Sequence, residues 1–209
     1  MEFPQAIKYQ IEGLSRAAER TIVLYGGLTT LVGPNGSGKT QLLRSLKRTL
    51  PNVIGGRKVR LLSGSRLWHL DHWRIDAAGH QQGLPAYDGA SFGGKNEQNR
   101  RLDMETAQGD FHTLGVRQDL QIKVATRLKC LFQRDVFMDW ENGELKVRFA
   151  APSSQGVPYS AAREASGLLE LVSLLTALYN DEIGALLIDE PEASLHPQLQ
   201  SFLLARSTR

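Results

Sequence analysis

The fold of this chain is decided by one glycine-rich stretch, Gly33-Pro34-Asn35-Gly36-Ser37-Gly38-Lys39-Thr40. The stretch satisfies the G-x-x-x-x-G-K-[ST] pattern of a phosphate-binding loop, or P-loop, in full. Its glycines let backbone N–H groups point inward at phosphate oxygens, and a helix beginning near Lys39 adds its positive end. We expect Lys39 to place its ammonium between the β- and γ-phosphates, and Thr40 to offer its hydroxyl to Mg²⁺. The stretch therefore predicts a nucleoside triphosphate site, with ATP and Mg²⁺ as cofactors.

The residues on either side of the loop have the pattern that a P-loop requires. Leu28–Val32 is predicted to be a strand that runs into the loop, and leucines recur at helical spacing from Leu42 to Leu50 after it. Further short strands are predicted at 7–11, 21–24 and 59–62. A strand, a loop and a helix in this order make a chance match improbable.

A second motif lies far downstream. The sequence Ala185-Leu186-Leu187-Ile188-Asp189-Glu190 is a short apolar strand that ends in two carboxylates. At the carboxyl edge of a parallel sheet, Asp189 would lie beside the P-loop and hold Mg²⁺ through water. Glu190 follows at once and is placed to polarise the attacking water as a general base. In a sequence without a P-loop, the same residues would be interpreted as solvated acids at the end of a strand.

The middle of the chain gives weaker signals. Residues 51–119 show little periodicity, and 76–115 is predicted to be a long loop or a loosely structured insertion. A helix face follows at Leu120, Val124, Leu128 and Leu131. Asn142-Gly143 between two alternating runs predicts a hairpin near 135–150, and helices are predicted at 164–179 and 197–205.

Composition sets broad limits on the class of protein. The chain has 209 residues, a net charge of +3 and a single cysteine, so neither an intrachain disulfide nor a Cys-x-x-Cys metal site is expected. Cys130 is predicted to be a buried thiol on a helix. No leader and no apolar run long enough for a membrane span is evident, which predicts a cytoplasmic protein with no membrane partner. The mild positive charge permits nucleic acid as a partner without arguing for it.

The stretch Asp189-Glu190-Pro191-Glu192-Ala193-Ser194-Leu195-His196-Pro197 resembles the Walker B motif and D-loop of ABC-type ATPases. Together with the Pro-Asn-Gly filling of the P-loop, it most resembles the OLD-like and SMC-like ATP-binding proteins. The resemblance covers about 5–50 and 160–205. It implies an α/β P-loop NTPase of ABC type, with a parallel core sheet, an N-terminal antiparallel β-subsheet and a helical and loop insertion.

The resemblance also implies a domain plan and partners. The whole chain, 1–209, would be one ATP-binding domain. Residues 1–50 would hold the N-terminal strands and P-loop, 51–160 the insertion with its hairpin, and 161–209 the signature helix and Walker B. The expected partner is a second copy or another ATPase subunit facing it across ATP, and an effector nuclease is a further candidate.

The resemblance extends to two less complete motifs. Ser166 and Gly167 match the signature pair that contacts the γ-phosphate held by a second subunit, although Leu168 replaces the usual small residue. Ordinary helix capping by Ser166 is the alternative. Arg66 resembles a lever residue of the family, with Gln81 and Gln82 as rivals and a surface arginine as the plain alternative.

Several features depart from the family or carry little signal. We expect no switch histidine in this sequence, since His196 lies too early for one, and neither heptads nor a zinc hook. Scattered loop histidines are expected rather than a metal site at His69, His72, His80 and His112. Packing is favoured over base stacking for Trp68 and Trp73.

Two functions therefore stay open. The first is an ATPase with Glu190 and Lys39 as its catalytic residues, in a DNA-related or phage-defence process. The second is a nucleotide-binding module that does not hydrolyse ATP, or a fragment of a larger OLD-like effector. A turnover assay set beside an ATP-binding assay separates an ATPase from a binding module.

Overall fold

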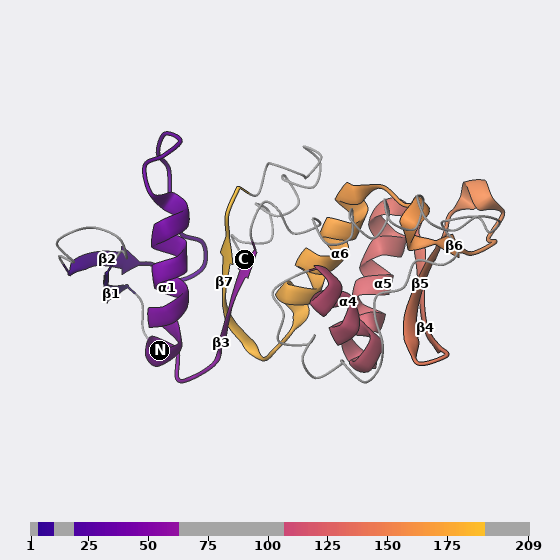
Figure 1. Cartoon of the computed structure of the whole chain (residues 1–209), viewed down its shortest axis with the longest axis horizontal. Helices are drawn as coiled ribbons and strands as arrows, with labels where there is room; N and C mark the ends of the chain where they lie inside the picture. The colour runs from indigo at the N-terminus through magenta and orange to yellow at the C-terminus, as the bar shows by residue number, and fades with distance from the viewer. Residues whose placement is uncertain (1–3, 11–18, 63–106, 191–209) are drawn as a thin grey trace. The chain divides into compact units, whose positions relative to one another are not determined.

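The computed structural model describes residues 4–10, 19–62 and 107–190 (Figure 1). The chain divides into two compact units. The first unit comprises Met1–Gly64 and Asp181–Arg209, and the second comprises Ser65–Asn180. Each unit has its own secondary structure and its own packing.

Two pairs of strands and one helix form the described part of the first unit. Strands β1 (Gln5–Tyr9) and β2 (Arg20–Leu24) pair antiparallel, so the predicted N-terminal antiparallel ribbon is confirmed. Strands β3 (Lys58–Leu62) and β7 (Ile183–Ile188) pair parallel, with Leu62 opposite Ile188. The described part of the unit is therefore mixed α/β and contains a parallel pair of strands, as expected for a P-loop fold.

Helix α1 (Lys39–Val53) connects the two pairs of strands and begins at the predicted residue. It packs against β1 on one side and against β3 and β7 on the other. Leucines at helical spacing supply the buried face, and a small core gathers there from Ile7, Leu46, Leu50 and Val59. This packing fixes the start of α1, and hence the P-loop, against the parallel strands.

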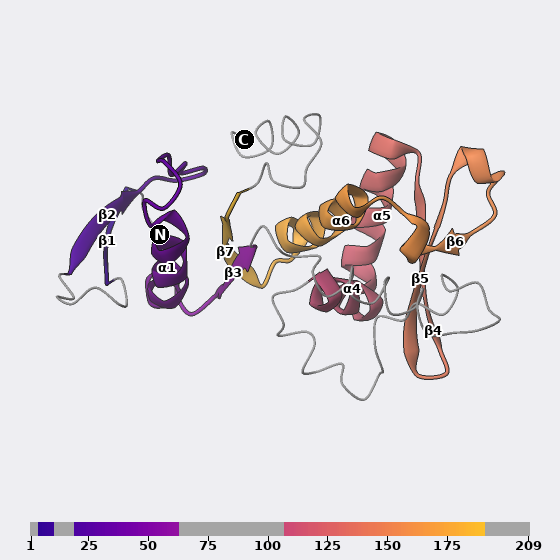
Figure 2. The ribbon, with the colours of Figure 1, turned by 45° about the horizontal axis from the view of Figure 1, so that its top comes forward.

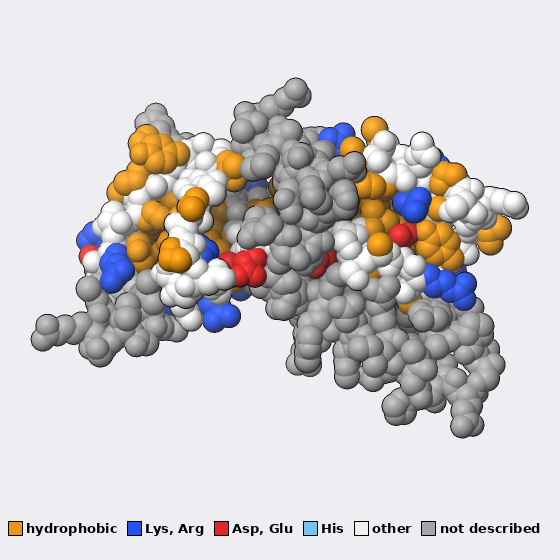
Figure 3. All heavy atoms as spheres, turned by 90° about the horizontal axis from the view of Figure 1, so that it is seen from above, with side chains coloured by type: hydrophobic (Ala, Val, Ile, Leu, Met, Phe, Trp, Pro, Cys, Tyr) orange, Lys and Arg blue, Asp and Glu red, His pale blue; other side chains and the backbone are white. Residues whose placement is uncertain are grey.

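The prediction of a strand at Leu28–Val32 is wrong. The structure assigns these residues to no strand or helix, and they follow a bend at Gly26 and Gly27. Among the described strands, β1 pairs with β2 and β3 with β7, which leaves this segment without a neighbouring ladder. Val32 is 92 % exposed, so the apolar residues of this segment cover no core in the described part of the chain. The space-filling view in Figure 3 shows hydrophobic side chains on the surface of the molecule.

Three helices and three strands form the described part of the second unit, together with two short 3₁₀ turns. The longer helices are α4 (Ala107–Val116), α5 (Gln118–Phe132) and α6 (Ser166–Tyr179). Strands β4 (Asp135–Glu141), β5 (Glu144–Ala150) and β6 (Tyr159–Ser160) form an antiparallel sheet in that order. The 3₁₀ turns are η2 (Pro152–Ser154) and η3 (Ala161–Arg163). Figures 1 and 2 show the three helices together on one side of the hairpin.

The predicted hairpin is confirmed, and its turn explains why the prediction works. Asn142 and Gly143 both have positive φ, 52° and 80°, which is the conformation of a type I′ turn. Asparagine and glycine tolerate this conformation better than other residues do. The turn sets the register of β4 against β5, which puts Leu145, Val147 and Phe149 on the buried face.

The prediction of a loop over 76–115 is wrong for its last residues, because α4 begins at Ala107. Two glycines and several polar residues hide this helix from sequence patterns. Tertiary packing stabilises it, since Phe111 and Leu114 are fully buried and Asp110 accepts a hydrogen bond from Ser173 of α6. Gly115 packs closely against the hairpin, because a Cβ there would lie 2.9 Å from Leu145 Cδ1 and that side chain would have to shift.

Two predictions about α5 also need correction. Leu120, Val124 and Leu128 are fully buried as expected, but Leu131 is 38 % exposed and Cys130 is exposed. The buried face repeats every four residues, and at 100° per residue Cys130 falls on the opposite side of the helix from Leu128.

Within the described residues, no helix is long and apolar enough to cross a membrane.

Candidate functional site

The P-loop connects β2 to α1 and takes the shape that its glycines permit. Gly36 and Gly38 have φ of 79° and 89°, a left-handed conformation that side chains with a Cβ rarely adopt. Gly38 is the N-cap of α1, and no side chain caps the helix there. The first backbone N–H groups of α1 have no acceptor within the helix, as in every α-helix. They can therefore bind an anion, as in other phosphate sites at helix N-termini.

Lys39 folds back over the loop that precedes it. Its Nζ donates hydrogen bonds to the carbonyl oxygens of Gly33 at 2.8 Å and Pro34 at 3.0 Å. These bonds hold the ammonium at the loop rather than out in solvent. A phosphate bound by the loop would therefore meet a cation that is already in place.

The two distant motifs meet at Thr40 and Asp189. Thr40 Oγ1 donates a hydrogen bond of 2.6 Å to Asp189 Oδ2, across 149 positions of sequence. The backbone N–H of Asp189 donates to the carbonyl oxygen of Leu62 at 2.8 Å, which continues the β3–β7 ladder by one residue. Parallel pairing thus carries the buried carboxylate of Asp189 to the start of α1.

The residues present fit a magnesium ion. Mg²⁺ prefers oxygen ligands in octahedral geometry at about 2.0–2.1 Å, which sets neighbouring ligand oxygens about 2.9 Å apart. The Thr40 hydroxyl oxygen and the Asp189 carboxylate oxygen lie 2.6 Å apart, so two oxygen donors of the kind that Mg²⁺ prefers meet at one point and would hold the ion there. In the described residues, no cluster of three or more His, Cys, Asp or Glu side chains forms a metal site of another kind.

Glu190 is exposed and has an unusual backbone. Its φ is 50°, in the left-handed region, where a residue with a side chain costs free energy unless its surroundings hold it. Such residues are concentrated at functional sites.

The comparison with protein families gives one match. The family described as "AAA domain, putative AbiEii toxin, Type IV TA system" matches residues 78–207, which is more than half of the chain. The chain belongs to this family of AAA domains. Its fold is therefore that of a P-loop NTPase, and its function is of the nucleotide-binding, ATPase type. The match includes Asp189 and begins downstream of the P-loop. Neither the curated proteins nor the solved structures contain a match to the chain.

In this AAA domain, Ser166 and Gly167 begin helix α6 in the second unit. Ala165 is the N-cap residue and makes no side-chain capping bond, so Ser166 is the first helical residue rather than the cap. The alternative of ordinary capping by Ser166 does not match this geometry. The first turn of α6 is closed by hydrogen bonds from the N–H groups of Leu168 and Leu169 to Ala165 O.

Sequence reasoning missed a polar network that supports this helix start. Glu164 is buried and accepts hydrogen bonds from the Tyr159 hydroxyl at 2.5 Å and from the Ala165 N–H at 3.1 Å. Arg134 lies 3.4 Å from the same carboxylate in an ion pair. Burial, followed by the contact with Glu164, raises the pKa of Tyr159 to about 12. No spacing in the sequence marks these three residues as a group, since they come together only through the sheet.

The remaining predicted candidates divide into two groups. The lever candidates Arg66, Gln81 and Gln82, the histidines at 69, 72 and 80 and both tryptophans at 68 and 73 lie outside the described residues. His112 is described, and it is not a loop residue as expected. It lies fully buried on α4, with its ring edge-on to Trp140 at 5.6 Å between centroids.

Proposed function

We propose that this AAA domain binds Mg·ATP at Gly33–Thr40 and hydrolyses it. The observation that carries the proposal is the hydrogen bond between Thr40 and Asp189, which brings a P-loop hydroxyl and a strand-end carboxylate to one point. A P-loop hydroxyl and a carboxylate at the end of a neighbouring strand are the protein groups that hold Mg²⁺ in P-loop NTPases.

Each residue of the proposed site has a separate task. Backbone N–H groups of the loop and the ammonium of Lys39 bind the phosphates and stabilise the charge that develops on them. Thr40 and Asp189 would hold Mg²⁺, which supplies charge neutralisation between the β- and γ-phosphates when bound. Glu190 orients the attacking water and accepts its proton.

The test separates binding from chemistry. Glu190→Gln keeps the size of the side chain and removes its charge, so ATP affinity should be unchanged while turnover falls by about 10²–10⁴-fold. A variant that turns over as fast as wild type excludes Glu190 as the base. If wild type binds ATP and releases no phosphate, the second function, a binding module without hydrolysis, replaces the first.

We further propose that two copies close on ATP. In this arrangement Ser166 and Gly167 of one copy would contact the γ-phosphate held by the P-loop of the other. Support comes from the position of both residues at the very start of a well-packed helix, where N–H groups favour an anion. Association should then be weak without nucleotide and stronger with ATP, because the triphosphate forms part of the contact.

Sedimentation of the Glu190→Gln variant tests this assembly. The mass should double with Mg·ATP and remain that of one chain with ADP or without nucleotide. Ser166→Arg would put a bulky side chain at the contact, and it should abolish the doubling while leaving ATP binding intact. An identical mass in all three states refutes the sandwich arrangement for this chain.

The family description suggests the setting in which ATP is used. We propose that this domain acts in a toxin–antitoxin or phage-defence process, alongside an effector nuclease or another partner of that system. Induced expression in bacterial cells tests the idea, with growth as the readout. Wild type should slow growth and Lys39→Ala should not, since the variant cannot bind ATP; equal growth of both cultures counts against a toxic role.

A further inference from the structure

A long part of the chain that includes the P-loop contains no acidic residue. Residues 20–70 hold nine of the 25 Lys and Arg residues and none of the 22 Asp and Glu residues. Net charge over the whole chain conceals this segregation, because it is only +3. An acid-free stretch of this kind points to an anionic partner.

Part of this charge has a structural task. Arg57 donates hydrogen bonds to the carbonyl oxygens of Asp181 and Ile183, and Lys58 forms an ion pair with Glu182. These contacts join the start of β3 to the start of β7. They do not account for the cations on the outer face of α1.

The outer face of α1 carries Arg44 and Arg48, one helical turn apart and both exposed. In the described part of the chain, no acidic side chain lies within ion-pair distance of Arg44. The helix has no acidic residue in its first turn or elsewhere. Two cations at this spacing can contact neighbouring phosphates of one strand.

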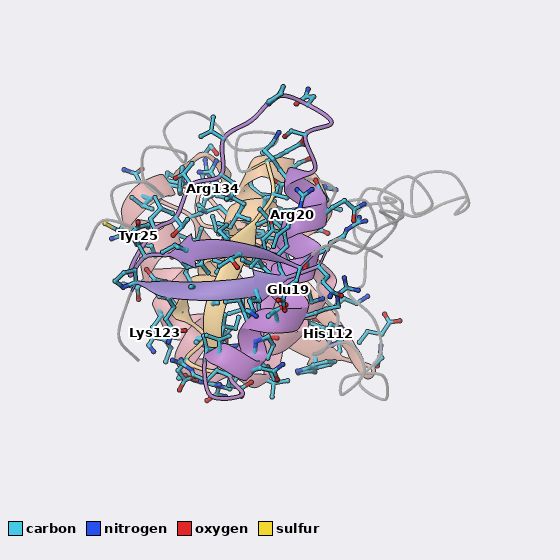
Figure 4. All side chains as sticks on the ribbon, turned by 90° about the vertical axis from the view of Figure 1, so that its left-hand side faces the viewer. Glu19, Arg20, Tyr25, His112, Lys123 and Arg134 are labelled. Carbon is cyan, nitrogen blue, oxygen red and sulfur yellow. The ribbon has the colours of Figure 1, made fainter. Side chains whose placement is uncertain are left out.

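An open cleft of about 410 Å³ adjoins Arg48, between α1 and the end of the β1–β2 ribbon. Its lining is polar and includes one aromatic residue: Lys8, Tyr9, Gln10, Glu19, Ser45, Arg48 and Thr49. The Ser45 hydroxyl donates to the Gln10 carbonyl oxygen at 2.7 Å, which fixes the ribbon against the helix. Figure 4 shows Glu19 and Arg20 at this end of the ribbon, beside α1.

Glu19 is the one carboxylate in this lining, and it faces Lys8 at 2.9 Å. Both side chains are more than half exposed, so the pair contributes little stability and a phosphate can compete for Lys8. Ser45 follows Lys39 by six residues, a rise of about 9 Å along the helix, which separates the cleft from the P-loop.

We propose that the outer face of α1 and this cleft bind single-stranded nucleic acid. Arg44 and Arg48 would contact consecutive phosphates, and a base would enter the cleft beside Tyr9. Polar groups and one aromatic ring next to cations are the features of sequence-tolerant single-strand sites. A membrane surface is disfavoured, because none of the large hydrophobic side chains that the described residues expose lies on α1. The proposal does not depend on ATP hydrolysis.

The test is fluorescence anisotropy with labelled 20-nucleotide single-stranded DNA and RNA, over a range of salt, without nucleotide. The double variant Arg44→Gln/Arg48→Gln removes two phosphate contacts, which should lower the slope of log K against log salt by about 1.4. If the two lines meet at 1 M salt, the same change in slope makes binding at 0.1 M salt weaker by about twenty-five-fold. Glu19→Gln should strengthen binding, since it releases Lys8.

The control is Lys123→Gln/Lys129→Gln, which removes the same net charge from exposed positions of α5 in the second unit. It should bind as wild type does, and both double variants should retain the ATP-induced thermal shift of wild type. If the two double variants lose affinity for single-stranded nucleic acid equally, the effect comes from net charge alone and the proposal is overturned. The proposal is also overturned if wild type binds neither single strand at low salt, if duplex binds as tightly, or if anionic phosphatidylserine vesicles bind more tightly.

Discussion

Asp189→Asn is the sharpest test of the proposed metal site. The substitution preserves the size of the side chain and an oxygen that can accept the 2.6 Å hydrogen bond from Thr40, but it removes the negative charge. In the absence of Mg²⁺, the cost is the difference between a charged and a neutral hydrogen bond, about 1 kcal/mol of stability. The fold should therefore survive.

The effect on Mg·ATP binding should be much larger. The attraction between unit charges at about 4 Å in water is about 1 kcal/mol, so a carboxylate and a divalent cation gain about 2 kcal/mol. This is a lower limit, because Asp189 is only 9 % exposed and water screens it less than a surface group. The dissociation constant for Mg·ATP should rise at least about thirty-fold.

The assay is titration calorimetry with ATP, performed once with Mg²⁺ and once with a chelator. Asp139→Asn is a matched control, because it makes the same substitution at an exposed position of β4 in the second unit. It should leave both affinities unchanged. The reasoning fails if Asp189→Asn binds Mg·ATP as tightly as wild type, or if it weakens ATP equally with the chelator present.

Three further outcomes are expected from substitutions elsewhere. Lys39→Ala should lose the stabilisation of about 2.7 kcal/mol that wild type gains at 100 times the dissociation constant for Mg·ATP; a thermal shift as large as that of wild type would remove Lys39 from the site. Gly115→Ala should lower the free energy of unfolding, measured in urea, by about 1 kcal/mol, because crowding against Leu145 outweighs the gain in helix propensity. A variant more stable than wild type would contradict the close packing at this position. Because the pKa of Tyr159 is raised to about 12, the stability that its neutral phenol contributes is complete below pH 10 and is lost as the pH rises to about 12. The free energy of unfolding of Tyr159→Phe should therefore fall less than that of wild type between pH 10 and 12. Parallel curves of unfolding free energy against pH for the two proteins would show that this phenol is not coupled to folding.

Local chemistry made part of this fold predictable from sequence. The loop at Gly33–Thr40 and the turn at Asn142 demand backbone conformations that few residues adopt, so their residues identify them directly. Helix α1 begins at the predicted Lys39 for the same reason, since a left-handed glycine precedes it. The contact between Thr40 and Asp189 followed from the rule that parallel strands present their carboxyl ends at one edge.

Features that depend on distant packing could not be predicted in this way. Helix α4 has weak periodicity and is held by burial of Phe111 and Leu114 against other elements. Leu28–Val32 has the composition of a strand, and yet a strand needs a neighbour, which composition does not specify. The network around Glu164 likewise joins three residues that no local pattern links. The acid-free stretch around α1 differs from these cases, because charge can be counted in the sequence without any structure.

The position of Asp189 depends on the register of β3 against β7, which is regular from Val59 opposite Ala185 to Leu62 opposite Ile188 and shifts between Lys58 and Val59. Contacts flank this regular stretch at both ends. At one end, Arg57 bonds to the backbone before and at the start of β7. Gly184 packs so closely there that a Cβ would lie 2.7 Å from both Arg57 and Ile54. At the other end, the Asp189 N–H donates to Leu62. A slip of one residue would turn every side chain of β7 to the other face and present Ile188 or Glu190 to Thr40. The metal site therefore rests on contacts far from it, and the tight glycine at position 184 is part of what holds the carboxylate in place.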